Sequence, residues 1–241
     1  MATKYLCVLM ISILVNLRVF GQVIHQIPQN LQDTSAKQYN HTNNYLKPNA
    51  FIIPGAFLVY SGLKPIVSGI QKLDDTIYSN IKLNHPGFHT NAEDYLMWTP
   101  SASVYLLDAF KAKTRHTFKE HLILDAGSIV ITGGVGYAMR LISRHINAYT
   151  THDTKFPSGH TANAFRGAEM LHQELKDNNR LLSYSGYLIA TSVGILRLYN
   201  KDHLLTEVIA GAGLGILSTK LTYWIFDKVK YKNRRNPISI N

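Results

Sequence analysis

Residues 155–162 read Lys-Phe-Pro-Ser-Gly-His-Thr-Ala, and this stretch decides the fold because it introduces a run with helical pattern, residues 161–175. Pro157 restricts the direction of the chain, and Gly159 lets the backbone approach a ligand closely. The free backbone N–H groups at the start of the following helix form a site for an anion. His160 adds a group that exchanges protons near neutral pH, so the stretch predicts chemistry on a bound anion.

A second polar stretch, residues 197–207, lies between two strongly apolar runs, residues 181–196 and 208–226. Within one helix, Arg197 and His203 would point in different directions, because six steps of about 100° do not return to the same face. The polar residues between them therefore predict a turn. This turn would bring the arginine, at the end of one helix, back over the histidine at the start of the next.

The four-residue spacing of His203 and Glu207 places both side chains on one face of a helix. The carboxylate can then accept the imidazole N–H, which makes the other ring nitrogen a better nucleophile. Simpler alternatives remain at this point. The second stretch would also suit an interfacial loop with a helix salt bridge, and the first a helix N-terminus capped by Ser158 with His160 on the surface.

Together, the two motifs resemble those of the type 2 phosphatidic acid phosphatase family. The signature of that family is a Lys/Arg-Pro stretch, then PSGH, then an Arg-x5-His-x3-Asp stretch. The gap of 36 residues between His160 and Arg197 lies in the range of the family, and the flanking residues 161–165 and 208–213 are also similar. The resemblance extends over residues 93–226, which is more than half of the chain.

The resemblance implies a metal-free phosphatase that needs no cofactor and acts on a phosphorylated lipid. His203 would attack phosphorus to form a phosphohistidine, and Glu207 would orient it. His160 would protonate the leaving oxygen and then activate water. Phosphoryl transfer of this kind depends mainly on in-line positioning and charge stabilisation. The groups implied to hold the non-bridging oxygens are Arg144, Arg197, Ser158 and the Gly159 amide.

Two positions differ from the family pattern. The acid after the nucleophile is Glu207, where the family usually has Asp, and aligning the first motif on Arg144 puts Tyr137 at the lysine and His145 at the proline. Arg140, one helical turn from Arg144, is the residue that would supply the missing cation. A degenerate member that binds lipid phosphate without turnover is therefore an alternative. A vanadate-dependent haloperoxidase, which shares these motifs, is a third.

The N-terminal part of the chain predicts export. Residues 1–21 combine a lysine, an apolar run and a small-residue cleavage site, as a signal peptide does; an uncleaved first membrane helix is the alternative. Cys7, the only cysteine, lies within this signal, so we expect no disulfide in the mature chain. Residues 22–92 are expected to be an exported region. Its apolar segment, residues 49–70, is interrupted by prolines, and residues 71–92 read as loops.

Residues 93–227 predict one all-α domain, a bundle of five to six helices embedded in a membrane, followed by a basic tail at residues 228–241. Three apolar runs in the domain are long enough, with their flanks, to cross a bilayer. These are residues 122–139, 181–196 and 208–226.

Basic segments predict the orientation. If the two histidine motifs face the exported side, residues 111–119, 176–180 and 228–235 all lie on the cytoplasmic side, as the positive-inside rule expects. We therefore expect an inner (cytoplasmic) membrane protein with its site facing the periplasm or exterior. A soluble periplasmic domain is the alternative, because 46% apolar residues and a mean hydropathy of −0.06 are modest. The net charge of +10 suits phosphorylated substrates and anionic lipids, and no motif indicates nucleic-acid binding.

Overall fold

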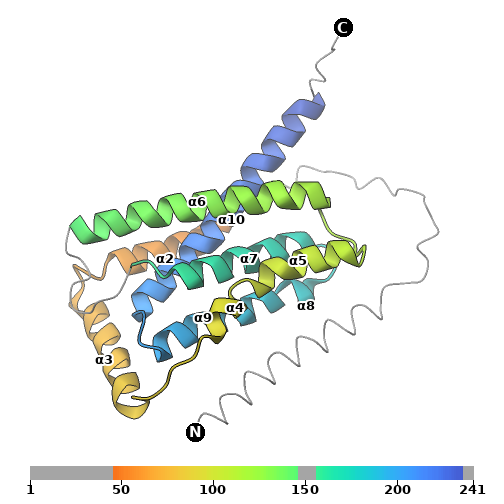
Figure 1. The fold of residues 1–241 in the computed structure, drawn as a ribbon. Helices are drawn as coiled ribbons and strands as arrows, with labels where there is room; N and C mark the ends of the chain where they lie inside the picture. The colour runs from red at the N-terminus through yellow and green to blue at the C-terminus, as the bar shows by residue number, and fades with distance from the viewer. Residues whose placement is uncertain (1–45, 146–155, 236–241) are drawn as a thin grey trace. The chain divides into compact units, whose positions relative to one another are not determined.

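The computed structural model of the chain describes residues 46–145 and 156–235, and every regular element in these ranges is a helix (Figure 1). This confirms the predicted all-α class. The predicted signal, residues 1–21, and residues 22–45 of the exported region lie outside the described residues. The elements are η1 (Pro48–Phe51), α2 (Ile52–Gly62), α3 (Ser68–Asn84), α4 (Ala92–Leu96), α5 (Thr99–Ala109), α6 (Phe118–His145), α7 (Gly159–Leu175), α8 (Arg180–Ser183), α9 (Ser185–Tyr199) and α10 (Leu205–Arg235).

Within the predicted domain, the described helices α5, α6, α7, α9 and α10 pack as a bundle, which agrees with the five to six expected. α7 packs against α10, α9, α5 and α6, and α10 packs in addition against α2. Ala164 and Ala168 of α7 contribute to a core with Ala190 and Val193 of α9, where small side chains let the helices approach closely. The helix that follows the Pro-Ser-Gly-His stretch thus packs against four other helices of the bundle.

Two glycines allow α10 to cross directly over the first turns of α7. A Cβ atom at Gly211 would lie 2.5 Å from the carbonyl oxygen of Ser158, and one at Gly215 would overlap the carbonyl oxygen of Ala162. Contacts this short do not occur with real side chains, so the close approach depends on glycine at both positions. The crossing brings the start of α7 to the start of α10.

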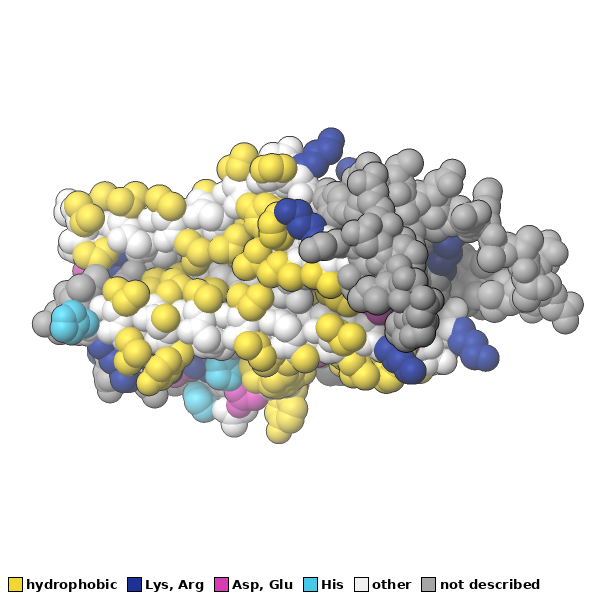
Figure 2. All heavy atoms as spheres, turned by 90° about the horizontal axis from the view of Figure 1, so that it is seen from above, with side chains coloured by type: hydrophobic (Ala, Val, Ile, Leu, Met, Phe, Trp, Pro, Cys, Tyr) yellow, Lys and Arg dark blue, Asp and Glu magenta, His cyan; other side chains and the backbone are white. Residues whose placement is uncertain are grey.

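Three helices of the described chain are long and apolar enough to cross a membrane: Phe118–His145, Arg180–Tyr199 and Leu205–Lys230. They contain the three runs from which spans were predicted. On α6, large apolar side chains such as Val130 and Ile142 are exposed. Figure 2 shows apolar side chains over much of the side of the molecule on which α6 lies. Such a surface suits contact with lipid, and the fold is of membrane type.

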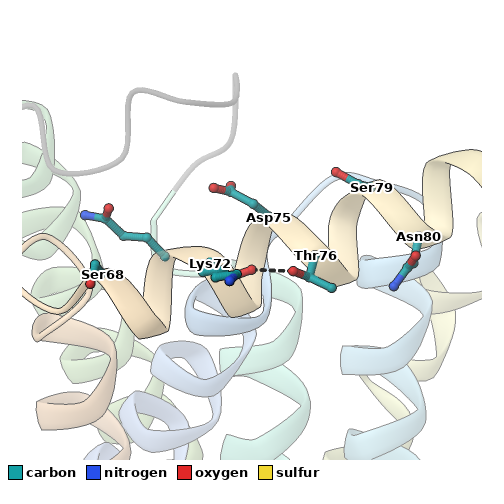
Figure 3. A pocket seen from close by; sticks show the side chains of 7 residues that line it. Ser68, Lys72, Asp75, Thr76, Ser79 and Asn80 are labelled. Atoms are coloured by element: carbon teal, nitrogen blue, oxygen red, sulfur yellow. Dashed lines mark hydrogen bonds between the residues drawn. The ribbon is translucent and has the colours of Figure 1, made fainter.

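The expectation of loops from residue 71 onward is wrong for residues 71–84, which belong to α3. Ile77 and Ile81 recur at helical spacing, but the polar residues between them obscured the pattern. α3 lies across the ends of the bundle helices, with its polar face open to solvent (Figures 1 and 3). That face consists of Ser68, Gln71, Lys72, Asp75, Thr76, Ser79 and Asn80.

As its prolines predicted, the apolar segment at residues 49–70 is interrupted and does not form one straight helix. α2 ends at Gly62, and residues 63–67, which include Pro65, separate it from α3. α2 packs against α10. Residues from Leu46 onward therefore belong to the same compact unit as the predicted helical domain.

Candidate active site

The start of α7 is held against the start of α10 through the backbone. The N–H group of Ser158 donates to the carbonyl oxygen of Glu207 at 3.1 Å. Ser158 stands at the N-cap position, but its hydroxyl pairs with the hydroxyl of Thr161 at 2.9 Å instead of capping a backbone N–H. The hydroxyl therefore does not occupy the N–H groups of the first turn, which are the donors of a helix N-terminal anion site.

Arg197 and His203 come together through the predicted turn. α9 ends at Tyr199 and α10 begins at Leu205, so the arginine is in the last turn of one helix. The histidine, expected at the start of the next helix, lies two residues before it. Nη1 of Arg197 also pairs with Oδ2 of Asp202 within the turn, at 3.0 Å. The side chains of Arg197 and His203 line the same pocket. The structure thus contains the turn that the sequence predicted.

Glu207 orients the imidazole ring of His203 through a contact with Nδ1. Nδ1 of His203 lies 2.8 Å from Oε2 of Glu207, and the backbone N–H of Leu204 donates to the same oxygen at 3.2 Å. Both side chains are buried. Because Nδ1 is engaged, Nε2 is the ring nitrogen left for a reacting group. The extra methylene of glutamate, compared with the aspartate usual in the family, does not prevent this contact.

The pocket beside these groups has a volume of about 510 Å³. Its polar wall combines Gly159, His160, Arg197 and His203 with Arg140 of α6. Nε of Arg140 has no hydrogen-bond partner within the part of the chain that the structure describes. This cation is therefore available to an anion in the pocket. The remaining lining residues, most of them apolar or uncharged, are Met97, Trp98, Ile129, Thr132, Gly133, Asn163 and the buried Arg166.

Three residues of the predicted phosphate-binding set, the buried Ser158 and two residues of α6, do not line this pocket. Tyr137 is 65% exposed, and Arg144 is exposed near the end of α6. Helix geometry gives the reason. Measured around the axis of α6 from Ile129, the lining residues extend from about −60° at Thr132 to about +40° at Gly133, and Arg140 lies within this arc at about +20°. Arg144, at about +60°, and Tyr137, at about +80°, lie outside it. Arg140, expected to replace the missing lysine, is the cation of α6 that lines the pocket.

α4 contributes two carboxylates that sequence reasoning missed. Oε1 of Glu93 lies 3.0 Å from Nη1 of Arg197, and Oδ1 of Asp94 lies 2.7 Å from Nε2 of His160. Glu93 is buried, whereas the side chain of Asp94 is 51% exposed. The partners are 104 and 66 residues away in sequence. Two adjacent acids before an apolar run were the only signal, and they did not indicate these partners.

α3 supports the site from outside the bundle. Asp74 accepts hydrogen bonds from the backbone N–H of Thr206 at 3.0 Å and from its hydroxyl at 2.6 Å. Lys64 forms a buried ion pair with Asp74 at 2.9 Å, and the hydroxyl of Ser61 donates to the carbonyl oxygen of Thr206 at 2.8 Å. Because Thr206 directly precedes Glu207, the N-terminal helices hold the first turn of α10 in place.

Residues 113–231 match the family model of the PAP2 superfamily. This part of the chain, which carries both histidine motifs, belongs to that superfamily, and the resemblance seen in the sequence is confirmed. The matched range begins after α5, so the supporting carboxylates Asp74, Glu93 and Asp94 lie outside it.

A lipid A 1-phosphatase from Porphyromonas gingivalis is 27% identical in an alignment 221 residues long, which covers 86% of this chain and 49% of that protein. The chain thus spans about half the length of this relative. Among solved structures, the first transmembrane PAP2 type phosphatidylglycerolphosphate phosphatase from Bacillus subtilis is similar, with 20% identity and a TM-score of 0.44. That likeness covers 73% of this chain and 97% of the Bacillus chain.

Proposed function

We propose that the protein is a metal-independent phosphatase that removes phosphate from a lipid through a phosphohistidine at His203. One observation carries the proposal. A histidine that contacts a carboxylate, a second histidine, and Arg140 and Arg197 all line one pocket at the N-terminus of α7. These groups supply the nucleophile, the acid and base, and the positive charge that phosphoryl transfer requires.

In the first step, Nε2 of His203 attacks phosphorus while the bond from phosphorus to the lipid oxygen breaks. Glu207 keeps the ring oriented through its 2.8 Å contact with Nδ1 and stabilises the positive charge that the ring gains. His160 gives a proton to the departing oxygen, so the lipid leaves as an alcohol. The phosphoryl group remains on His203.

In the second step, a water molecule attacks the phosphorus of the phosphohistidine. His160, now neutral, takes a proton from that water. The bond between phosphorus and Nε2 breaks, and its electron pair returns to His203. Inorganic phosphate leaves, and both histidines are again in their starting protonation states.

Positive charge and backbone N–H groups hold the non-bridging oxygens in this scheme. We assign direct contacts to Arg140, Arg197 and the N–H of Gly159, which line the pocket. Ser158 is fully buried and anchors this end of α7 to the backbone of Glu207. Arg144, one turn further along α6, adds positive charge near the pocket.

A phosphorylated lipid, as a monoester or a diphosphate, is the substrate class that we propose. Its support is the apolar side of the pocket, with Trp98 and Ile129, next to the polar wall, together with the three membrane-length helices. The relative from Porphyromonas gingivalis is a lipid A 1-phosphatase, which agrees with this class. From the positions of the basic segments, we place the protein in the inner membrane with the pocket on the exported side.

The test is release of phosphate by detergent-solubilised protein in the presence of excess chelator. The substrates are phosphatidic acid, phosphatidylglycerol phosphate, a polyprenyl diphosphate and lipid A. Wild type is compared with His203→Ala and with His89→Ala, which replaces an exposed histidine that does not line the pocket. We expect chelator-resistant release by wild type and His89→Ala, and no release by His203→Ala. A radiolabelled phosphoenzyme, stable to alkali and labile to acid, should form on wild type only.

Other outcomes separate the alternatives. Release that the chelator abolishes, or that His203→Ala retains, contradicts the phosphohistidine mechanism. Tight binding of a lipid phosphate without release by wild type would instead support a binding protein. The specific observation in favour of that second candidate is that the position of the family's lysine is occupied by Tyr137, which lies outside the pocket.

A further inference from the structure

Asp94 makes a direct contact with the predicted acid and base of the reaction. Its Oδ1 lies 2.7 Å from Nε2 of His160. A carboxylate accepts hydrogen bonds but cannot donate them. The contact therefore requires a proton on Nε2 of His160, and it leaves Nδ1 as the only ring nitrogen free to exchange protons with another group.

The segment that carries Asp94 is anchored to the turn that carries His203. The N–H of Thr90 donates to Oδ1 of Asn200 at 3.0 Å, and Nδ2 of Asn200 donates back to the carbonyl oxygen of Thr90 at 2.8 Å. Nζ of Lys201 donates to the carbonyl oxygen of Phe88 at 3.0 Å. These bonds give the start of α4 a defined position relative to the pocket, and they therefore hold Asp94 within reach of His160.

Glu93, the residue before Asp94, also helps to fix the position of α4. Glu93 is buried and binds Nη1 of Arg197 at 3.0 Å, and it also accepts a hydrogen bond from Asn200. Adjacent positions on a helix diverge by about 100°, so α4 can direct one carboxylate to each of two pocket groups. Breaking the contact of Asp94 by moving α4 would also break the buried pair of Glu93.

We infer that Asp94 is a positioning residue for His160: it holds Nε2 of the ring so that Nδ1 delivers the proton to the leaving oxygen and later takes one from water. This inference rests on the proposed phosphatase function. The two histidines are then oriented through opposite ring nitrogens. Glu207 holds Nδ1 of His203 and exposes Nε2, whereas Asp94 holds Nε2 of His160 and exposes Nδ1.

The proton balance indicates which substrates should react more slowly when Asp94 is lost. In the first step, the proton on Nδ1 moves to the lipid oxygen as the phosphorus–oxygen bond breaks and the bond from phosphorus to His203 forms. An alkoxide leaving group needs that proton, but a nitrophenolate leaves as a stable anion without it. A residue that acts through His160 is therefore needed for alkyl phosphates and not for nitrophenyl phosphate.

The experiment compares Asp94→Asn with wild type on dodecyl phosphate and on 4-nitrophenyl phosphate. The quantity is kcat/KM, because it reports the steps up to departure of the alcohol and excludes hydrolysis of the phosphoenzyme. We expect kcat/KM for dodecyl phosphate to fall by roughly 10- to 100-fold, and that for 4-nitrophenyl phosphate to change by less than about threefold. Asp75→Asn is the matched control, since Asp75 lies on the solvent-facing side of α3 (Figure 3).

A double variant tests whether Asp94 acts through His160. In a His160→Ala background, Asp94→Asn should cause no further loss on dodecyl phosphate. An equal loss on both substrates, or a full additional loss in the double variant, would overturn the inference in favour of a structural role. Unchanged activity of Asp94→Asn would also overturn it. Increased activity would overturn it as well, because Asp94 would then compete with the substrate for His160. If wild type and His203→Ala are equally inactive, it is the proposed function that fails.

Discussion

The carboxylate of Asp74 receives both the backbone N–H and the hydroxyl of Thr206, at 3.0 and 2.6 Å, across 132 residues of sequence. Thr206 belongs to the first turn of α10, directly before Glu207. A residue of the N-terminal region thus caps the helix on which the candidate nucleophile depends. The same carboxylate pairs with the buried Lys64.

Asp74→Ala should destabilise the protein and also lower its activity. It removes the cap of α10 and the ion-pair partner of Lys64. Breaking a buried pair from one side costs about 3–5 kcal/mol. Thermal unfolding in detergent measures the loss of stability, and phosphate release below the unfolding temperature measures the effect on the site.

The double variant Lys64→Met, Asp74→Leu separates the two contributions of Asp74. It removes both charges, so it should be less destabilised than Asp74→Ala. It still lacks the carboxylate that accepts the N–H and hydroxyl of Thr206, however, so its activity should stay below that of wild type. Full activity in the double variant would show that the cap does not position the first turn of α10.

Glu207→Gln should lower kcat by about 100- to 10,000-fold, because an amide stabilises the imidazolium of His203 poorly and favours the wrong tautomer. Its size matches that of glutamate, so folding should be retained. Glu207→Asp keeps the charge but shortens the reach to Nδ1, and its activity should lie between those of wild type and Glu207→Gln. The measurement is steady-state release of phosphate, with circular dichroism as the folding control. A fully active Glu207→Gln contradicts the assigned role.

Arg140→Ala and Arg144→Ala should differ strongly, although both remove one cation from α6. Arg140 lines the pocket, and its loss should lower kcat/KM by about 100- to 1,000-fold, as expected for a group that stabilises transition-state charge. Arg144 is exposed and outside the pocket, so its loss should cost less than about tenfold. Equal losses, or a greater loss at Arg144, would contradict the assignment of Arg140 as the cation of α6 that contacts the substrate.

Gly215→Ala should destabilise the crossing of α7 and α10. The added Cβ atom would overlap the carbonyl oxygen of Ala162, so the helices must separate, at a cost of about 1–3 kcal/mol. Gly69→Ala is the matched control in α3, where a Cβ atom has open space. That change should be neutral or stabilise by up to about 1 kcal/mol. Thermal unfolding of both variants in the same detergent compares them directly.

His116 should make stability depend on pH. It precedes α6 and contacts Glu174 at 2.9 Å and Asp227 at 3.4 Å. Burial alone would lower the pKa of His116, but hydrogen bonds to Asp227 and Glu174 outweigh it, so the pKa is raised. A raised pKa stabilises the fold below the ordinary pKa of histidine, and this contribution disappears as pH rises through the pKa of the folded state.

His116→Gln removes this titration and tests the sign. Between about pH 6 and about pH 9, which brackets the titration of histidines, wild type should lose more stability than the variant. The difference in melting temperature between the two proteins should therefore shrink as the pH rises. A difference that grows with pH would mean that burial, and not the two carboxylates, dominates at His116.

Helix and turn placement around the two motifs could be predicted because both depend on local spacing. The contact between His203 and Glu207 was predicted from their separation of four residues, and it forms although His203 lies two residues before α10 and not on the helix itself. The turn after Arg197 follows from the polar interruption between two apolar runs. α3 was missed because its apolar residues are separated by many polar ones, and its helical face becomes evident only where Asp74 meets α10.

By itself, the sequence determined the all-α class and the helices of membrane length, and it singled out two histidines that line one pocket. Tertiary structure decided which cation of α6 lines the pocket, and it brought Glu93 and Asp94 to Arg197 and His160. The physical reason is the range of the interactions. Helix periodicity relates residues a few positions apart, whereas contacts over 66 and 104 residues depend on how the helices pack.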